Sequence, residues 1–170
     1  MDVPTQRWLP GGEEPPASNS ASLFKLVRLG LAGPAVFQCG AARSVTLVVR
    51  ADMADFPGPQ FIGYSYQHRI GAARAISTNP RMVILADSTP LFDTHGFRKD
   101  RLRAQASDNH GGRGTTVLFR NMSVGWVETP EAGVEGDNIF LARDTYEYEG
   151  DEAPADPADT FLLPAYVERK

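Results

Sequence analysis

The middle of the chain arranges its apolar and polar positions in a way that predicts four short strands. Residues 115–119 and 123–127 are rich in valine, threonine and aromatic side chains and lie three residues apart, which indicates a β-hairpin. Residues 61–67 alternate between two faces. Residues 82–86 are apolar on both faces, which predicts a covered central strand over 81–86. Residues 44–50 carry β-branched side chains at four positions and predict a further strand.

Helical spacing occurs near the N-terminus. Apolar side chains recur every three or four residues after a serine-rich start, and Gly30 is a natural stop, so we predict a short helix over 20–29. Residues 34–39 are expected to be extended. Residues 1–17 contain four prolines and predict an extended arm ahead of one globular domain over 18–170. The predicted fold class is α+β, an antiparallel β-sheet with a short N-terminal helix and long loops.

The inward faces of these elements predict a hydrophobic core. Residues 88–109, in contrast, carry many charges and show no regular spacing of apolar side chains. That long segment is expected to be a surface loop or a frayed helical turn, and long loops in compact domains often carry function. The apolar side chains that we expect to be mostly buried are Leu23, Val27, Phe37, Ile62, Val83, Leu85, Val117, Phe119 and Val127.

Composition narrows the function classes. A chain of 170 residues with 42% hydrophobic and 22% charged residues is ordinary for one globular domain. The net charge of -4 argues against nucleic acid as a partner, because such domains are usually basic. No apolar run is long enough to span a membrane, and the N-terminus lacks a signal-peptide pattern. Cys39 is the only cysteine, which excludes an internal disulfide.

The candidate chemistry centres on one histidine. Asp87, Asp108 and His110 offer oxygen and nitrogen ligands, but only two of them are close in sequence, and no spaced metal motif is present. We therefore expect no metal, no cofactor and no catalytic group, and interpret His110 as structural. It should be at least half buried and bonded through a ring nitrogen to a carbonyl or an acid, with Asp87 the first choice. A pair between Cys39 and His110 stays open, although a buried structural thiol is favoured.

A polar, glycine-rich segment leads into the predicted hairpin. A phosphate-binding loop would need Gly-Lys-Ser/Thr at the start of a helix, whereas these glycines precede a strand, so a turn is favoured. His68 and His95 lie in unrelated segments and are expected to face solvent. The residues that we assign to the structural motif of this hairpin are Asn109, His110, Gly111, Gly112, Gly114 and Asn121.

Six phrases of the sequence follow the order found in a known family. They are Ser18–Phe24, Ala35–Cys39, Tyr64–Tyr66, Pro80–Asp87, Asn109–Phe119 and Gly136–Leu141. Together they resemble planctomycete prepilin-type proteins, which are pilin- or pseudopilin-like and carry a histidine followed nine or ten residues later by Asp-Gly. In this chain Asn121-Met122 stands where that signature has Asp-Gly. By the same resemblance, 136–141 is expected to be the closing strand.

The resemblance implies a pilin-head-like fold and a non-catalytic structural or interaction role. The chain would be the globular head of a prepilin-like subunit, of the type II secretion or type IV pilus-like kind. Its place would be the cell envelope, periplasmic or extracellular, and its partners would be other proteins or like subunits. In the family a cleavage site and an apolar helix precede the head; the chain is expected to be the head alone, a trimmed product or a diverged member. The alternative is a metal- or ligand-binding accessory protein, or a hydrolase, that uses the loop from Asp87 to His110.

Overall fold

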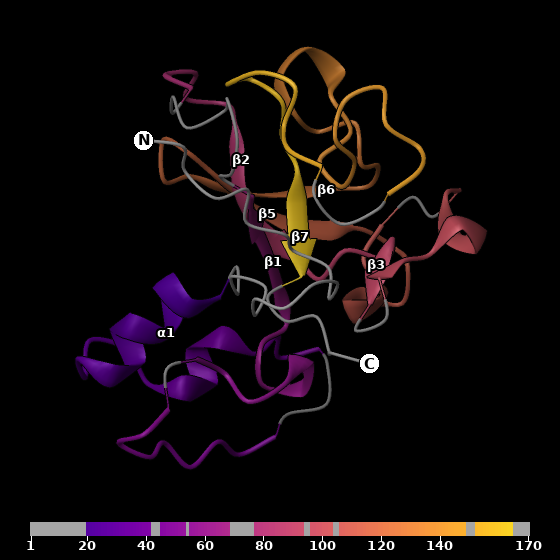
Figure 1. Cartoon of the computed structure of the whole chain (residues 1–170). Helices are drawn as coiled ribbons and strands as arrows, with labels where there is room; N and C mark the ends of the chain where they lie inside the picture. The colour runs from indigo at the N-terminus through magenta and orange to yellow at the C-terminus, as the bar shows by residue number, and fades with distance from the viewer. Residues whose placement is uncertain are drawn as a thin grey trace, which may run out of the picture.

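The computed structural model describes residues 20–41, 45–53, 55–68, 77–93, 96–103, 106–148 and 152–164. Over these residues the chain has an α+β fold, in which a short helix and several 3-10 turns accompany a mainly antiparallel sheet structure (Figure 1). The predicted arm over 1–17 lies outside the described residues. The prediction of a single domain over 18–170 stays a prediction.

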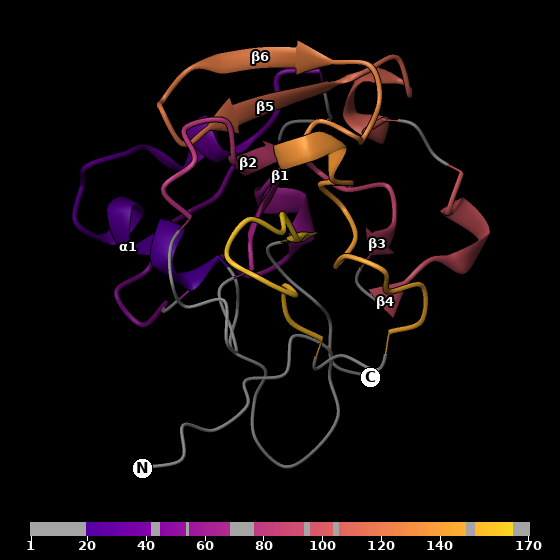
Figure 2. The same ribbon diagram turned by 90° about the horizontal axis from the view of Figure 1, so that it is seen from above.

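A five-stranded antiparallel sheet forms the centre of the fold. Its strands are β1 (Tyr64–Gln67), β2 (Val83–Asp87), β5 (Thr115–Phe119), β6 (Val124–Val127) and β7 (Leu162–Pro164). Their order across the sheet is β6-β5-β2-β1-β7, and each strand runs antiparallel to its neighbours. Figure 2 shows the β5–β6 hairpin along one margin of the sheet. The four strands expected from the sequence are therefore confirmed, with small differences at their ends.

The charged segment over 88–109 has more structure than expected. It contains a two-stranded ribbon of β3 (Phe92–Asp93) and β4 (Gly96–Phe97). Phe92 is buried, and its ring lies 5.8 Å from that of Phe161. The prediction of a surface loop was wrong at this point because apolar side chains within a charged stretch had a core to enter.

The predicted helix is confirmed as α1 (Ala21–Arg28), but two neighbouring expectations were wrong. Residues 34–39 are not fully extended, because Pro34–Phe37 forms the 3-10 turn η1, for which proline in the first turn is well suited. Residues 45–50 form no strand. The Gln38 side chain exchanges hydrogen bonds with both backbone groups of Val45, and Val48 is 75% exposed. High strand propensity alone did not supply a partner strand.

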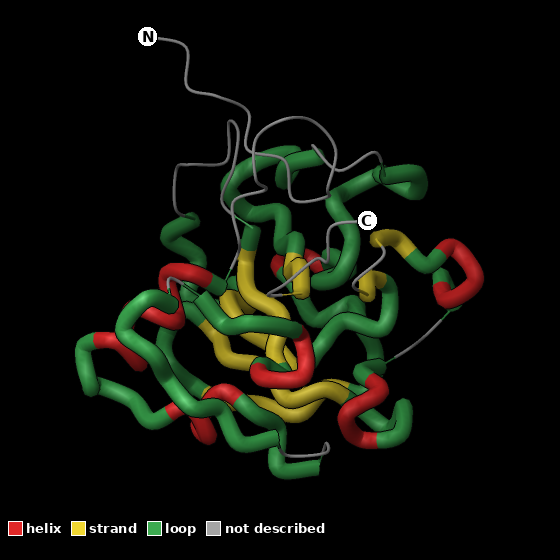
Figure 3. Tube along the Cα trace, turned by 60° about the horizontal axis from the view of Figure 1, so that its bottom comes forward, coloured by secondary structure: helices red, strands yellow, loops and turns green. Residues whose placement is uncertain are grey.

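Further 3-10 turns lie around the sheet, as Figure 3 shows. They are η2 (Pro59–Phe61), η4 (Lys99–Arg101), η5 (Asp108–His110) and η6 (Val134–Gly136). The expected closing strand over 136–141 is instead a turn region, and the strand that completes the sheet is β7. Ile139 still contacts that strand, since its carbonyl accepts the Leu162 N–H at 2.9 Å.

Two hydrophobic clusters fill the described fold. One lies between the sheet and the C-terminal loops, and the other packs α1 and η1 against the start of β1. Five of the nine predicted core residues are buried: Val27, Phe37, Ile62, Val83 and Val117. The other four are only partly buried: Leu23, Leu85, Phe119 and Val127. Within the described residues no helix has both the length and the apolar character needed to cross a membrane.

Candidate functional site

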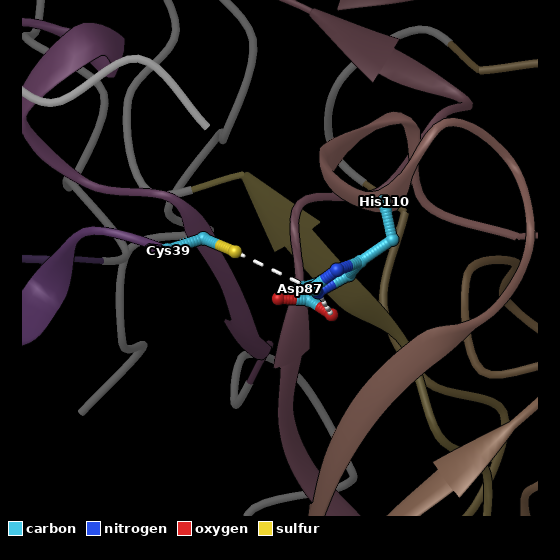
Figure 4. A group of neighbouring side chains, drawn as sticks. All are labelled: Cys39, Asp87 and His110. Carbon is cyan, nitrogen blue, oxygen red and sulfur yellow. Dashed lines mark hydrogen bonds and ion pairs between the residues drawn. The ribbon is translucent and has the colours of Figure 1, made fainter. Parts of the chain in front are cut away.

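Three side chains from distant segments meet where the chain enters the β5–β6 hairpin. Cys39 follows η1, Asp87 ends β2, and His110 ends η5. The His110 Nε2 atom lies 3.0 Å from Asp87 Oδ2 and 3.6 Å from Cys39 Sγ. Figure 4 shows the three side chains pointing toward one another. Their potential ligand atoms all lie within 4.8 Å of one another, and we call this group the Cys–Asp–His cluster.

The Cys–Asp–His cluster is largely removed from solvent. The exposed fractions are 2% for the Asp87 side chain and 21% for the His110 side chain, while Cys39 is 6% exposed. The prediction that His110 is at least half buried and bonded to Asp87 is confirmed. The sequence left a pair between Cys39 and His110 open, and the structure brings these two residues into contact.

Backbone turns chosen by the local sequence aim His110 at the cluster. The Ser107 hydroxyl accepts the Asn109 N–H at 3.2 Å and so caps the N-terminus of η5. Gly111 and Gly112 then adopt positive φ angles of 65° and 72°, which side-chain-bearing residues rarely take. The predicted turn-forming role of these glycines is confirmed, because the chain reverses here before β5 starts.

Asp87 is fixed by donors from two other segments. The backbone N–H of Thr116 donates to Asp87 Oδ2 at 2.6 Å. The Asn109 amide donates to Asp87 Oδ1 at 3.4 Å and to the Gly63 carbonyl at 2.8 Å. Asn109 thus joins the turn that carries His110 to both β2 and the start of β1. The carboxylate is held in place by groups that would remain if the histidine were removed.

Two glycines allow the close packing around the cluster. A Cβ on Gly63 would lie 2.8 Å from the backbone nitrogen of Cys39, so a side chain there would push Cys39 away. A Cβ on Gly114 would lie 2.3 Å from the ring of Trp126, which meets the His110 ring edge-on with centroids 5.1 Å apart. Sequence reasoning missed Gly63 and Trp126 as supports. For Gly63 the available signal was its place within a predicted strand, where a glycine often marks a close approach of two backbones.

The remaining candidates lie elsewhere. Asp108 pairs with Arg101 and is not part of the cluster. His68 was expected to face solvent, and this was wrong: its backbone N–H donates to the Phe161 carbonyl at 2.8 Å, which draws the residue into the sheet margin and the core. Burial lowers the pKa of His68 to about 4. His95 lies outside the described residues.

A second group of charged side chains holds the C-terminal loops. The Arg143 guanidinium lies between two carboxylates: its Nε is 3.8 Å from Asp137 Oδ1, and its Nη1 is 2.6 Å from Asp156 Oδ2. The Asp137 carboxylate also accepts the Thr160 N–H at 2.7 Å. Burial raises the pKa of Asp137 to about 6. Because the arginine occupies the space between the carboxylates, this group is an internal ion network that joins the C-terminal loops.

The geometry of the Cys–Asp–His cluster limits its chemistry. In a nucleophile, base and orienting-acid triad, the nucleophile and the acid contact opposite nitrogens of the imidazole. Here Cys39 Sγ and Asp87 Oδ2 both face Nε2 of His110, so the cluster lacks the geometry to relay a proton from one ring nitrogen to the other. Sulfur, nitrogen and oxygen atoms that converge on one point are instead a donor set suited to a transition-metal ion.

Comparison of the chain with protein-family models, with curated proteins and with solved structures gives no match.

Proposed function

We propose that this chain is a non-catalytic interaction domain, the globular head of a prepilin-like subunit of the cell envelope. The observation that carries the proposal is the convergence of the phrases that resemble the prepilin-type proteins. Cys39 comes from the phrase over 35–39, Asp87 from the phrase over 80–87, and His110 is the histidine of the phrase over 109–119. His110 contacts both of the others, and the ligand atoms of all three lie within 4.8 Å of one another. Chance matches would have no reason to meet at one point, so this contact supports a shared architecture.

The hairpin turn supports the same proposal. Asn121 Oδ1 accepts the Ser123 N–H at 3.0 Å, a turn that aspartate at this position would make equally well. Met122 has a φ of 68°, the left-handed conformation that glycine adopts without steric strain. The backbone therefore has the geometry that the family's Asp-Gly favours, although the two residues differ.

An apolar groove supports a role in protein interaction. It has a volume of about 490 Å³ and crosses one face of the sheet beside α1, with Val36, Tyr64, Leu85, Leu118 and Val124 in its lining. Val36 and Val124 are exposed. Contiguous exposed apolar surface commonly marks an interaction site. Since the resemblance implies assembly of like subunits, we assign this groove to contact with a second copy of the chain.

Site-specific photo-cross-linking tests the proposal in the organism that encodes the protein. A photoreactive amino acid replaces Val124 in the groove, and the same amino acid at Tyr146, which is exposed outside the groove, is the matched control. We expect the protein in the envelope fraction and a covalent adduct of two copies from position 124 alone. Protein confined to the soluble fraction, or adducts that are absent or equal at both positions, would overturn the proposal.

A further inference from the structure

We propose that Cys39, Asp87 and His110 form a binding site for one Zn²⁺ ion, which ties the segment after α1 to the central sheet. This inference does not depend on the proposed function, because it rests only on the positions of the three side chains. The sequence favoured a structural His110 over a metal ligand because it showed only two neighbouring ligands. The structure adds Cys39 from a distant segment and removes Asp108.

Two of the three separations between the ligand atoms match a tetrahedral zinc site, and the third, between Cys39 and Asp87, is within 4.8 Å. Zinc bonds of about 2.3 Å to sulfur and about 2.0–2.2 Å to nitrogen and oxygen imply ligand separations of roughly 3.6 Å for sulfur to nitrogen and roughly 3.3 Å for nitrogen to oxygen. The observed separations are 3.6 Å between Cys39 Sγ and His110 Nε2, and 3.0 Å between His110 Nε2 and Asp87 Oδ2. The first edge already has the required length. The separation between His110 Nε2 and Asp87 Oδ2 needs to increase by only a few tenths of an ångström when the ion replaces the hydrogen bond between them.

The donor types select the metal. Calcium and magnesium prefer oxygen ligands throughout, whereas a thiolate and an imidazole favour zinc and related transition metals. When Zn²⁺ binds, the Cys39 thiol loses its proton to water, and the thiolate and the Asp87 carboxylate together balance the two charges of the ion. This charge balance matters because Cys39 and Asp87 are almost fully buried, and a buried charge without a partner is costly. His110 is the most exposed of the three, so a water molecule completes the fourth position from its side.

The surrounding groups act as the outer support that metal ligands need. The Thr116 N–H and the Asn109 amide hold the Asp87 carboxylate, and Gly63 lets Cys39 approach. Outer partners of this kind orient the ligands, and their loss commonly weakens metal affinity by about 10–100-fold. The site therefore predicts an effect for Asn109→Ala, although Asn109 donates hydrogen bonds and is not itself a ligand.

A bound ion would cross-link two parts of the fold. Cys39 belongs to the segment whose Phe37 packs in the cluster around α1, while Asp87 and His110 belong to the sheet and the hairpin entrance. Zinc that binds the folded state alone stabilises it, and above Kd the stabilisation grows with the logarithm of the zinc concentration. At zinc concentrations about 100-fold above Kd, we expect the melting temperature to rise by about 5–10 °C.

Metal titration of the full chain tests the inference. The protein is purified with a reducing agent and a chelator, dialysed, and then loaded with Zn²⁺ for metal analysis or with Co²⁺ for absorption spectroscopy. We expect one ion per chain and a sulfur-to-cobalt charge-transfer band. Cys39→Ser and His110→Gln should each lower affinity by about 100-fold or more, and Asn109→Ala by about 10–100-fold. Asp108→Asn is the matched control, because Asp108 lies in the same loop outside the cluster, and it should bind like the wild type.

Two results would overturn the inference. One is a wild-type chain that binds no stoichiometric zinc. The other is zinc binding that Cys39→Ser and His110→Gln leave unchanged, which would place the ion elsewhere. If either variant fails to fold, the cobalt spectrum of the wild-type chain still decides: bound cobalt without the sulfur band excludes Cys39 as a ligand.

Discussion

His68 should make the folded protein sensitive to mild acid. The residue is 2% exposed, and neither ring nitrogen has a hydrogen-bond partner among the described residues. Burial lowers the pKa of His68 from 6.5 to about 4, so the folded protein keeps this ring neutral where the unfolded chain takes up a proton. The contribution to stability is therefore complete above pH 6.5 and is lost as the pH falls through that value toward 4.

The size of the effect follows from the two pKa values of His68. Between pH 8 and pH 5 the linkage gives a loss of about 2 kcal/mol in the free energy of unfolding. Asp137 acts in the opposite direction, because its pKa is raised to about 6 and it favours the folded state as the pH falls. The pH dependence of the wild-type protein therefore mixes both effects, and a variant is needed to separate them.

His68→Leu removes the titration of His68 while keeping the position apolar and similar in volume. Urea unfolding of both proteins at pH 8 and pH 5 gives four free energies of unfolding. We expect the wild-type protein to lose about 2 kcal/mol more than His68→Leu over this interval. Equal losses in the two proteins would refute the reasoning, as would an NMR titration that places the midpoint of His68 near 6.5 in the folded state.

Three further predictions concern packing, backbone strain and burial of charge. Phe161→Ala should lower the free energy of unfolding by about 3–5 kcal/mol, and Phe119→Ala by only about 1–2 kcal/mol because Phe119 is partly exposed; urea unfolding compares them. Met122→Gly should raise the same quantity by about 0.5–1 kcal/mol, since it relieves a left-handed residue. The contribution of Asp137 to the stability of the folded protein should fall as the pH rises through about 6. Melting temperatures measured between pH 4 and pH 7 should show this fall in the wild-type protein and not in Asp137→Asn.

The site shows how local and long-range information divide. The contact between His110 and Asp87 was predictable, because glycines beside the histidine fold the chain back over the strand that Asp87 ends. Cys39 was not predictable as a third member, because its position depends on how η1 packs and on the backbone approach that Gly63 permits. The placement of Asp108 outside the cluster depends likewise on its pairing with Arg101.

The sequence by itself determined the elements whose signal is local. The alternation over β1, the apolar run of β2 and the closely spaced strands β5 and β6 each fit one strand, and the spacing of α1 fits one helical face. Only the tertiary structure decided which strand-like segment finds a partner and which polar side chain is buried. Residues 45–50 remained unpaired and His68 entered the core, because strand pairing and burial depend on surfaces contributed by segments far away in the chain.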